Sequence, residues 1–139
     1  MKKGMKRRDF IESGGKITLA AGALTLTVGP ALNSEPIDSN FIHHVFFWMK
    51  EPENKLHIER FQKGLRDLVT IEAIKSHHLG IPAETRREVI DSSYQYSLLT
   101  IFQDKKAHDL YQVHPVHDSF RIIVNELCSK VLVYDSVIF

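Results

Sequence analysis

The stretch FIHHVFFWM, Phe41 to Met49, decides which folds the chain can adopt. Its β-branched and aromatic residues favour an extended strand. Side chains alternate between the two faces of a strand, so Phe46 and Trp48 lie on one face and Val45 and Phe47 on the other. Both faces are therefore largely apolar, and a strand without a polar face is covered on both sides. The sequence predicts a sheet with helices on one face and a second apolar surface on the other.

The residues after this strand have the periodicity of a helix. Apolar side chains recur at Ile58, Phe61, Leu65 and Leu68. This spacing forms the buried stripe of an amphipathic helix, and it predicts a helix within residues 54–69.

The rest of the chain continues the alternation of strands and helices. Strands are predicted over residues 74–81, 94–102 and 130–139. Asp104 is a capping residue and predicts a short helix after it. Proline suits the first turn of a helix and pushes the residue before it out of the α region, so Pro115 ends this helix and starts another. The order β-α-β-β-(αα)-β predicts one ferredoxin-like α+β unit.

The predicted helices can cover only one face of the predicted sheet. The other apolar face needs a cover as well, and the simplest one is a second copy of the sheet packed face to face. The sequence therefore predicts a symmetric homodimer.

The first 34 residues differ in composition from the rest. Six of the 18 lysines and arginines lie in the first sixteen residues, and the apolar run ITLAAGALTLTV follows them. A run of about a dozen residues is too short to span a membrane, which takes roughly 20. Arg7 and Arg8, followed by Phe10 and Ile11, resemble a twin-arginine export signal. We expect an export signal and short linker over 1–34 and a folded domain over 35–139. The protein is then periplasmic or otherwise exported, and no membrane association is expected after the signal is removed. A membrane-anchoring or packed N-terminal helix is the alternative.

The charge of the remaining chain excludes one class of partner. From Glu35 onward there are 12 basic and 15 acidic side chains, with no basic stripe. Binding to nucleic acid depends on neutralising phosphates, so no nucleic-acid partner is expected. Cys128 is the only cysteine, so the chain forms no internal disulfide and relies on its core or on association.

The segment LYQVHPVHDSF, residues 110–120, holds the candidate catalytic residues. If Pro115 starts a helix, His117 falls in its first turn, where the positive end of the helix dipole disfavours an imidazolium. A neutral imidazole can accept a proton, and Tyr111 can donate a hydrogen bond to a carbonyl that is becoming an enolate. We predict that His117 and Tyr111 are catalytic in proton abstraction next to a carbonyl, without a cofactor.

Two further histidines are candidates for binding a small-molecule ligand. His44 lies on a face of the first strand and could line the same cavity. His114 precedes Pro115, which also suits a capping or packing residue. Both residues of the catalytic pair have a structural alternative. For His117 it is an imidazole that forms a hydrogen bond to a backbone carbonyl, and for Tyr111 it is a ring that only packs between helix and sheet. Five other histidines receive no role: His43, His57, His77, His78 and His108.

A chain with eight histidines also raises the question of a metal. His114 and His117, with His44 as a third nitrogen ligand, would resemble a zinc site. Pro115 places His114 before the helix rather than on its face, so no metal site is predicted. A phosphate-binding loop, a cysteine pair and a nucleophile elbow are absent from the sequence.

Three segments resemble the stress-responsive A/B barrel (Dabb) family. They are HHVFFWMK at 43–50, SLLTIFQDKKAHDLYQVHPVHDSF at 97–120 and KVLVYDSV at 130–137. The most specific part is the pattern Tyr-x-x-His-Pro-x-His. The resemblance implies a ferredoxin-like unit whose dimer forms an α+β barrel.

The resemblance also implies a range of functions. The family includes heat-stable plant proteins and a plant polyketide cyclase that needs no cofactor and uses a histidine of this segment as general base, aided by a tyrosine. The matching positions are His117 and Tyr111, and His44 is taken as the counterpart of a histidine in the first strand. The identity of the cyclase's substrate does not carry over to this chain, and our first hypothesis is a protein that binds a small carbonyl or phenolic compound. The alternatives are a non-catalytic, stress-related binding or structural module and a metal- or haem-handling periplasmic protein.

Overall fold

The computed structural model describes residues 41–139, in which strands and helices follow the predicted order. The elements are β1 (Phe41–Met49), α1 (Lys55–Leu68), β2 (Ser76–Gly80), β3 (Tyr96–Phe102), α2 (Lys105–Gln112), α3 (Pro115–Leu127) and β4 (Cys128–Ser136). The expected ferredoxin-like α+β unit, with strands β1 to β4 and helices α1 to α3, is confirmed. The predicted export signal and the boundary at residue 35 lie outside the described residues. Among the described residues, no helix is both long and apolar enough to cross a membrane.

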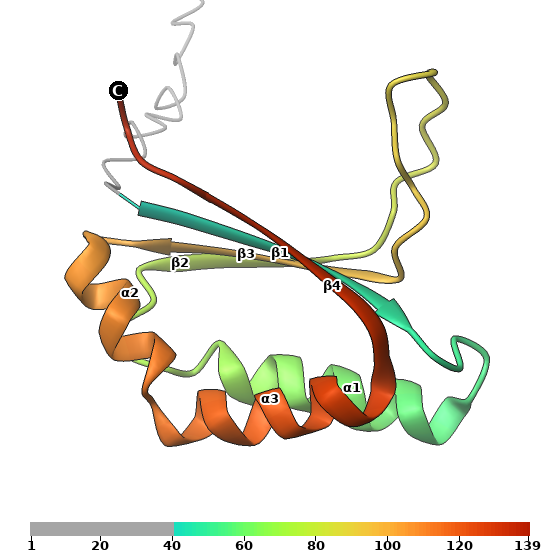
Figure 1. The fold of residues 1–139 in the computed structure, drawn as a ribbon, viewed down its shortest axis with the longest axis horizontal. Helices are drawn as coiled ribbons and strands as arrows, with labels where there is room; N and C mark the ends of the chain where they lie inside the picture. Colours follow the sequence, from blue (N-terminus) through green and yellow to red (C-terminus); the bar gives the residue numbers. More distant parts are fainter. Residues whose placement is uncertain (1–40) are drawn as a thin grey trace, which may run out of the picture. The chain divides into compact units, whose positions relative to one another are not determined.

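The four strands form one antiparallel sheet in the order β2-β3-β1-β4. Strand β1 lies in the interior of the sheet, where His43 stands opposite Thr100 of β3 and opposite Asp135 of β4. Residues in register on neighbouring strands share a face of the sheet, so these three side chains lie together. Helices α1 and α3 run across this same face, and α2 lies at one end of it (Figure 1). We call this the helix face.

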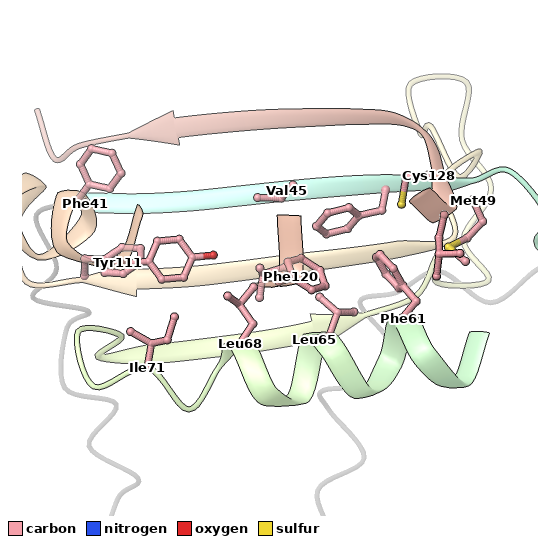
Figure 2. Close-up of a cluster of buried hydrophobic side chains, with 14 residues drawn as sticks. Phe41, Val45, Met49, Phe61, Leu65, Leu68, Ile71, Tyr111, Phe120 and Cys128 are labelled. Atoms are coloured by element: carbon pink, nitrogen blue, oxygen red, sulfur yellow. The ribbon is translucent and has the colours of Figure 1, made fainter. Parts of the chain in front are cut away.

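The core lies between the helix face and the helices (Figure 2). Its buried apolar residues are Phe41, Val45, Phe47, Met49, Phe61, Leu65, Leu68, Ile71, Leu98, Phe102, Tyr111, Phe120, Leu127 and Cys128. Helix α1 begins where the side chain of Asn54 accepts hydrogen bonds from the backbone N–H groups of Leu56 and His57. At Gly64 of α1, an added Cβ would come within 2.9 Å of Cδ2 of Phe120, so glycine permits the close approach of α1 and α3.

The other face of the sheet carries apolar side chains without a helix over it in the described chain (Figure 1). The half-buried side chains of Phe46 and Trp48 of β1 lie there. The connection between β2 and β3 reaches over part of this face, since Tyr94 packs edge-on against Phe46 with ring centroids 4.9 Å apart. Tyr134 of β4, which is 60% exposed, lies on the same face. We call this surface the open face. It is the second apolar face that the alternation in β1 predicts.

Candidate functional site

A cavity of about 220 Å³ lies on the helix face, against α3 and the strands β1 and β4. Most of its wall is apolar, and a few polar side chains project from α2, α3 and β1. Its lining residues are His43, Val45, Phe47, Leu98, Tyr111, Gln112, His117, Phe120, Arg121, Val124, Asn125, Val131 and Val133. An apolar wall with a few convergent polar groups is the usual composition of a small-molecule site.

Tyr111 reaches this cavity from the last turn of α2 and is almost completely buried. Figure 2 shows its hydroxyl oxygen pointing away from Phe41 and towards the middle of the core. Burial raises the pKa of the phenol above its ordinary value, because the charged phenolate loses its hydration. Tyr111 is therefore a neutral phenol near pH 7 and can donate a hydrogen bond.

His117 reaches the cavity from the first turn of α3 and is also buried. Its ring centroid lies 4.6 Å from that of Tyr111. Burial lowers the pKa of His117, and the positive charge of Arg121 lowers it further. A backbone hydrogen bond with Gln112 acts in the opposite direction. The imidazole is therefore neutral at pH 7, and burial is the largest of these causes.

The two ring nitrogens of His117 differ in their partners. Among the described residues, Nδ1 of His117 has no hydrogen-bonding partner, although it is buried. The bond to Gln112 raises the pKa, as expected when an imidazole N–H donates to a backbone carbonyl. The donor is then Nε2, which leaves Nδ1 with its lone pair. A buried nitrogen without a partner is costly in a native protein and suggests that a ligand completes it.

His43 is a third polar residue of the cavity, and it is one of the five histidines to which the sequence pattern assigns no role. It is buried, and its Nδ1 lies 2.6 Å from Oδ1 of Asp135. An ionised carboxylate can only accept, so Nδ1 carries the proton in this contact. The ring centroid of His43 lies 6.0 Å from that of Tyr111. The cavity thus has two imidazoles in its wall with a phenol near both.

Comparison with known families agrees with this fold. Residues 41–138 match the model of the stress responsive A/B barrel domain, which covers well over half of the chain. The chain belongs to the stress-responsive A/B barrel family. No curated protein matches the sequence.

Several solved structures have the same fold. A Dabb family protein with a ferredoxin-like fold from Mesorhizobium loti is 24% identical, with a TM-score of 0.60, over 73% of this chain and 98% of that one. A dimeric ferredoxin-like protein of unknown function from Jannaschia sp. is 24% identical, with a TM-score of 0.57, over 70% and 98%. A hydroxynitrile lyase from Passiflora edulis is 17% identical, with a TM-score of 0.60, over 73% and 95%. At these identities the likeness shows the fold alone.

His44 does not join the cavity of this A/B barrel domain, which corrects the expectation that it lines the same space as His117. It lies on the open face, where its ring packs against Phe46 with centroids 4.3 Å apart. The physical reason is the alternation of side chains, which sends His43 and His44 to opposite faces. Burial lowers the pKa of His44, and the nearby His78 adds to this effect. A role for His44 in binding a ligand on the open face stays a prediction.

His114 has the capping geometry that its place before Pro115 suggests. It is the N-cap of α3, and its Nδ1 accepts a hydrogen bond from the backbone N–H of Val116 at 3.2 Å. His114 is not among the residues that line the cavity. The combination of His114, His117 and His44 as metal ligands is therefore not assembled by the fold.

Proposed function

We propose that the protein binds a small carbonyl compound in the cavity and moves a proton on the carbon next to the carbonyl. His117 is the general base, and Tyr111 is the hydrogen-bond donor. The observation that carries this proposal is the buried, unpartnered Nδ1 of His117 in the wall of a cavity beside a neutral phenol.

The proposed step balances without a cofactor. The C–H bond next to the carbonyl breaks, its proton passes to the neutral imidazole of His117, and its electron pair moves to the carbonyl oxygen as an enolate. The hydroxyl of Tyr111 donates a hydrogen bond to that oxygen as the negative charge develops. Return of the proton from His117 to another position gives isomerisation, and attack of the enolate on a second carbonyl of the same compound gives ring closure.

The cavity supports this chemistry by its polarity and its size. Its walls are mostly apolar, and a ligand that displaces water from them would strengthen the hydrogen bonds formed there. A volume of about 220 Å³ is below the usual range for drug-sized ligands, roughly 300–1,000 Å³. A ligand of one ring with short substituents, such as a phenolic ketone, fits this size.

Exchange of the ligand's α-proton with solvent deuterium tests the proposal directly. Full-length protein is incubated in D₂O with a panel of small aryl and phenolic ketones, and incorporation is followed by NMR. We expect catalysed exchange with wild-type protein and its loss with His117→Gln, while His57→Gln at a half-buried position on α1, outside the cavity, retains it. Exchange that is absent from the whole panel, or equal in wild type and His117→Gln, would favour a non-catalytic binding or structural module.

We also propose that two copies associate through the open face, so that two sheets form one α+β barrel. The support is the apolar character of this face, where the rings of Phe46, Tyr94 and Tyr134 pack edge to face without a covering helix in the described chain.

Export of the protein by its N-terminal signal is likewise a proposal. It is tested by fractionating cells that express the full chain and a variant with Arg7→Lys and Arg8→Lys.

A further inference from the structure

Three side chains that commonly bind metals converge beside the cavity, at the end of the sheet where α2 lies. They are His43 of β1, His108 of α2 and Asp135 of β4. One donor atom from each residue lies within 4.8 Å of the donor atoms of the other two. None of the three belongs to the His117 and Tyr111 pair, and the sequence predicts no metal site.

The fold fixes two of these side chains through strand register. His43 and Asp135 stand opposite each other on the neighbouring strands β1 and β4, so their side chains share the helix face. The contact between Nδ1 of His43 and Oδ1 of Asp135 is 2.6 Å long. The hydroxyl of Thr100 donates a hydrogen bond to the backbone carbonyl of His43 at 3.2 Å.

His108 completes the group from α2, and its ring is held on several sides. The ring of Phe41 stacks on it with centroids 4.3 Å apart and the planes 24° from parallel. The side-chain amide of Gln112 lies 3.0 Å from Nε2 of His108. His43 and His108 are only 6% and 8% exposed, with ring centroids 4.9 Å apart. These contacts orient the two rings, and an ion would draw the donor atoms, which now lie within 4.8 Å of one another, closer together.

We propose that His43, His108 and Asp135 form a binding site for a divalent transition-metal ion of the zinc type. Two imidazole nitrogens and one carboxylate oxygen are a common ligand set for Zn²⁺. Three protein ligands leave a coordination position for water or a ligand group, as in catalytic zinc sites. When the ion binds through Nδ1 of His43, the proton now held between that atom and Asp135 is released to solvent.

The third ligand brings charge and access to the site. The carboxylate of Asp135, which is partly exposed, supplies the negative charge and leaves a path from solvent to the site.

This inference goes beyond the proposed function, because the site uses different side chains and its binding can be measured without any substrate. His43 also lines the cavity, so a bound ion would lie at the edge of the space that His117 faces. Loss of metal binding and loss of proton exchange are therefore separate results.

Zinc titration of the tag-free, chelator-treated full chain tests the site. Competition with a chromophoric chelator gives stoichiometry and affinity, and thermal unfolding with and without Zn²⁺ gives an independent readout. We expect one ion per chain and a higher unfolding temperature with Zn²⁺, since a ligand that binds only the folded state stabilises it. His108→Gln and Asp135→Asn should each weaken binding by at least about tenfold.

His57→Gln is the matched control, because it removes a histidine on α1 that is not among the three proposed ligands. It should leave both readouts unchanged. If His108→Gln does not fold, Asp135→Asn decides alone, since that substitution changes an exposed carboxylate to an amide of similar shape. No binding of Zn²⁺, or binding that both variants retain at wild-type affinity, would overturn the proposal.

Discussion

The ring of Tyr111 on α2 lies with its centroid 4.6 Å from the ring of His117 on α3. Pro115 stands between them in the sequence and is the first residue of α3. A continuous helix would place residues six positions apart on widely separated faces, because one turn takes 3.6 residues. The break before Pro115 turns the chain, so that both side chains meet at one cavity. The proline therefore positions the pair that we propose as acid and base.

Replacing His117 with Gln should abolish the proposed proton transfer while the domain remains folded. Glutamine can occupy similar space and form a hydrogen bond, but it cannot accept the proton. General acid–base catalysis contributes about 10²–10⁴ in rate, so a loss of this size in α-proton exchange is expected. Circular dichroism checks folding, and the His57→Gln variant supplies the comparison. A variant that is folded and fully active would exclude His117 as the base.

Replacing Tyr111 with Phe should slow the same exchange with little effect on stability. The ring still fills the core, but the donor to the enolate oxygen is gone. Removal of one such donor typically costs about 10²–10³ in rate. Tyr96→Phe is the matched control, because it removes a hydroxyl that accepts a hydrogen bond from Gln62 at 3.0 Å and is not among the cavity's lining residues. Equal rates in both variants would argue against a role for the Tyr111 hydroxyl.

The pH dependence of exchange should report on His117. Its folded-state pKa lies below the ordinary histidine value of 6.5, so His117 stays a neutral base above that value and is protonated as the pH falls through the lowered pKa. Arg121 is one cause of the lowering, so Arg121→Gln should move the acidic limb of the rate profile to higher pH. If the acidic limb lies at the same pH in Arg121→Gln and in wild type, Arg121 does not lower the pKa of the group that limits the rate.

Stability should change with pH in the same direction. Because the folded state disfavours protonated His117, the unfolded state takes up a proton first as the pH falls below about 6.5. Protonation of His117 therefore leaves the free energy of unfolding unchanged above pH 6.5. It lowers this free energy as the pH falls from 6.5 to the lower folded-state pKa of His117. Denaturant unfolding at several pH values should show a smaller loss in His117→Gln than in wild type. An equal loss in the two proteins would assign the pH dependence to other groups.

Much of the fold could be predicted from local sequence patterns. The two apolar faces of residues 41–49 indicated a strand that is covered on both faces, and Pro115 indicated the break between α2 and α3. These features depend on periodicity and on backbone sterics, which are visible along the chain. The sequence placed His117 in the first turn of a helix, but it did not show the burial that lowers the pKa of this imidazole most.

The choice between His43 and His44 could not be made from sequence. Both faces of β1 are apolar, so periodicity separates the two histidines without showing which face α1 and α3 cover. The pairing of His43 with Asp135 depends on the register of β1 and β4, which are far apart in the chain. Alternation alone placed His43 with Val45 and Phe47, and it would have pointed to His43 if the covered face had been known.

Close packing of α1 against α3 should make Gly64 sensitive to substitution. A Cβ at this position would lie 2.9 Å from Cδ2 of Phe120 and 3.0 Å from Cδ1 of Ile123. Relieving such contacts in a packed core costs about 1–3 kcal/mol, which outweighs the gain in helix propensity from alanine. Gly64→Ala should therefore lower the free energy of unfolding in denaturant titrations. An unchanged or higher stability would show that the two helices can separate at little cost.

The open face should govern the oligomeric state. Tyr134 lies on this face and is 60% exposed, so Tyr134→Glu should leave the single chain folded but place a charge between two apolar sheets. We expect wild-type protein to sediment as a dimer at micromolar concentration and Tyr134→Glu to sediment as a monomer. Leu56→Glu is the matched control, because Leu56 is 75% exposed on α1, which covers the opposite face of the sheet. A monomeric wild type would contradict the proposed dimer. A dimer that Leu56→Glu dissociates and Tyr134→Glu does not would show that the copies associate through another surface.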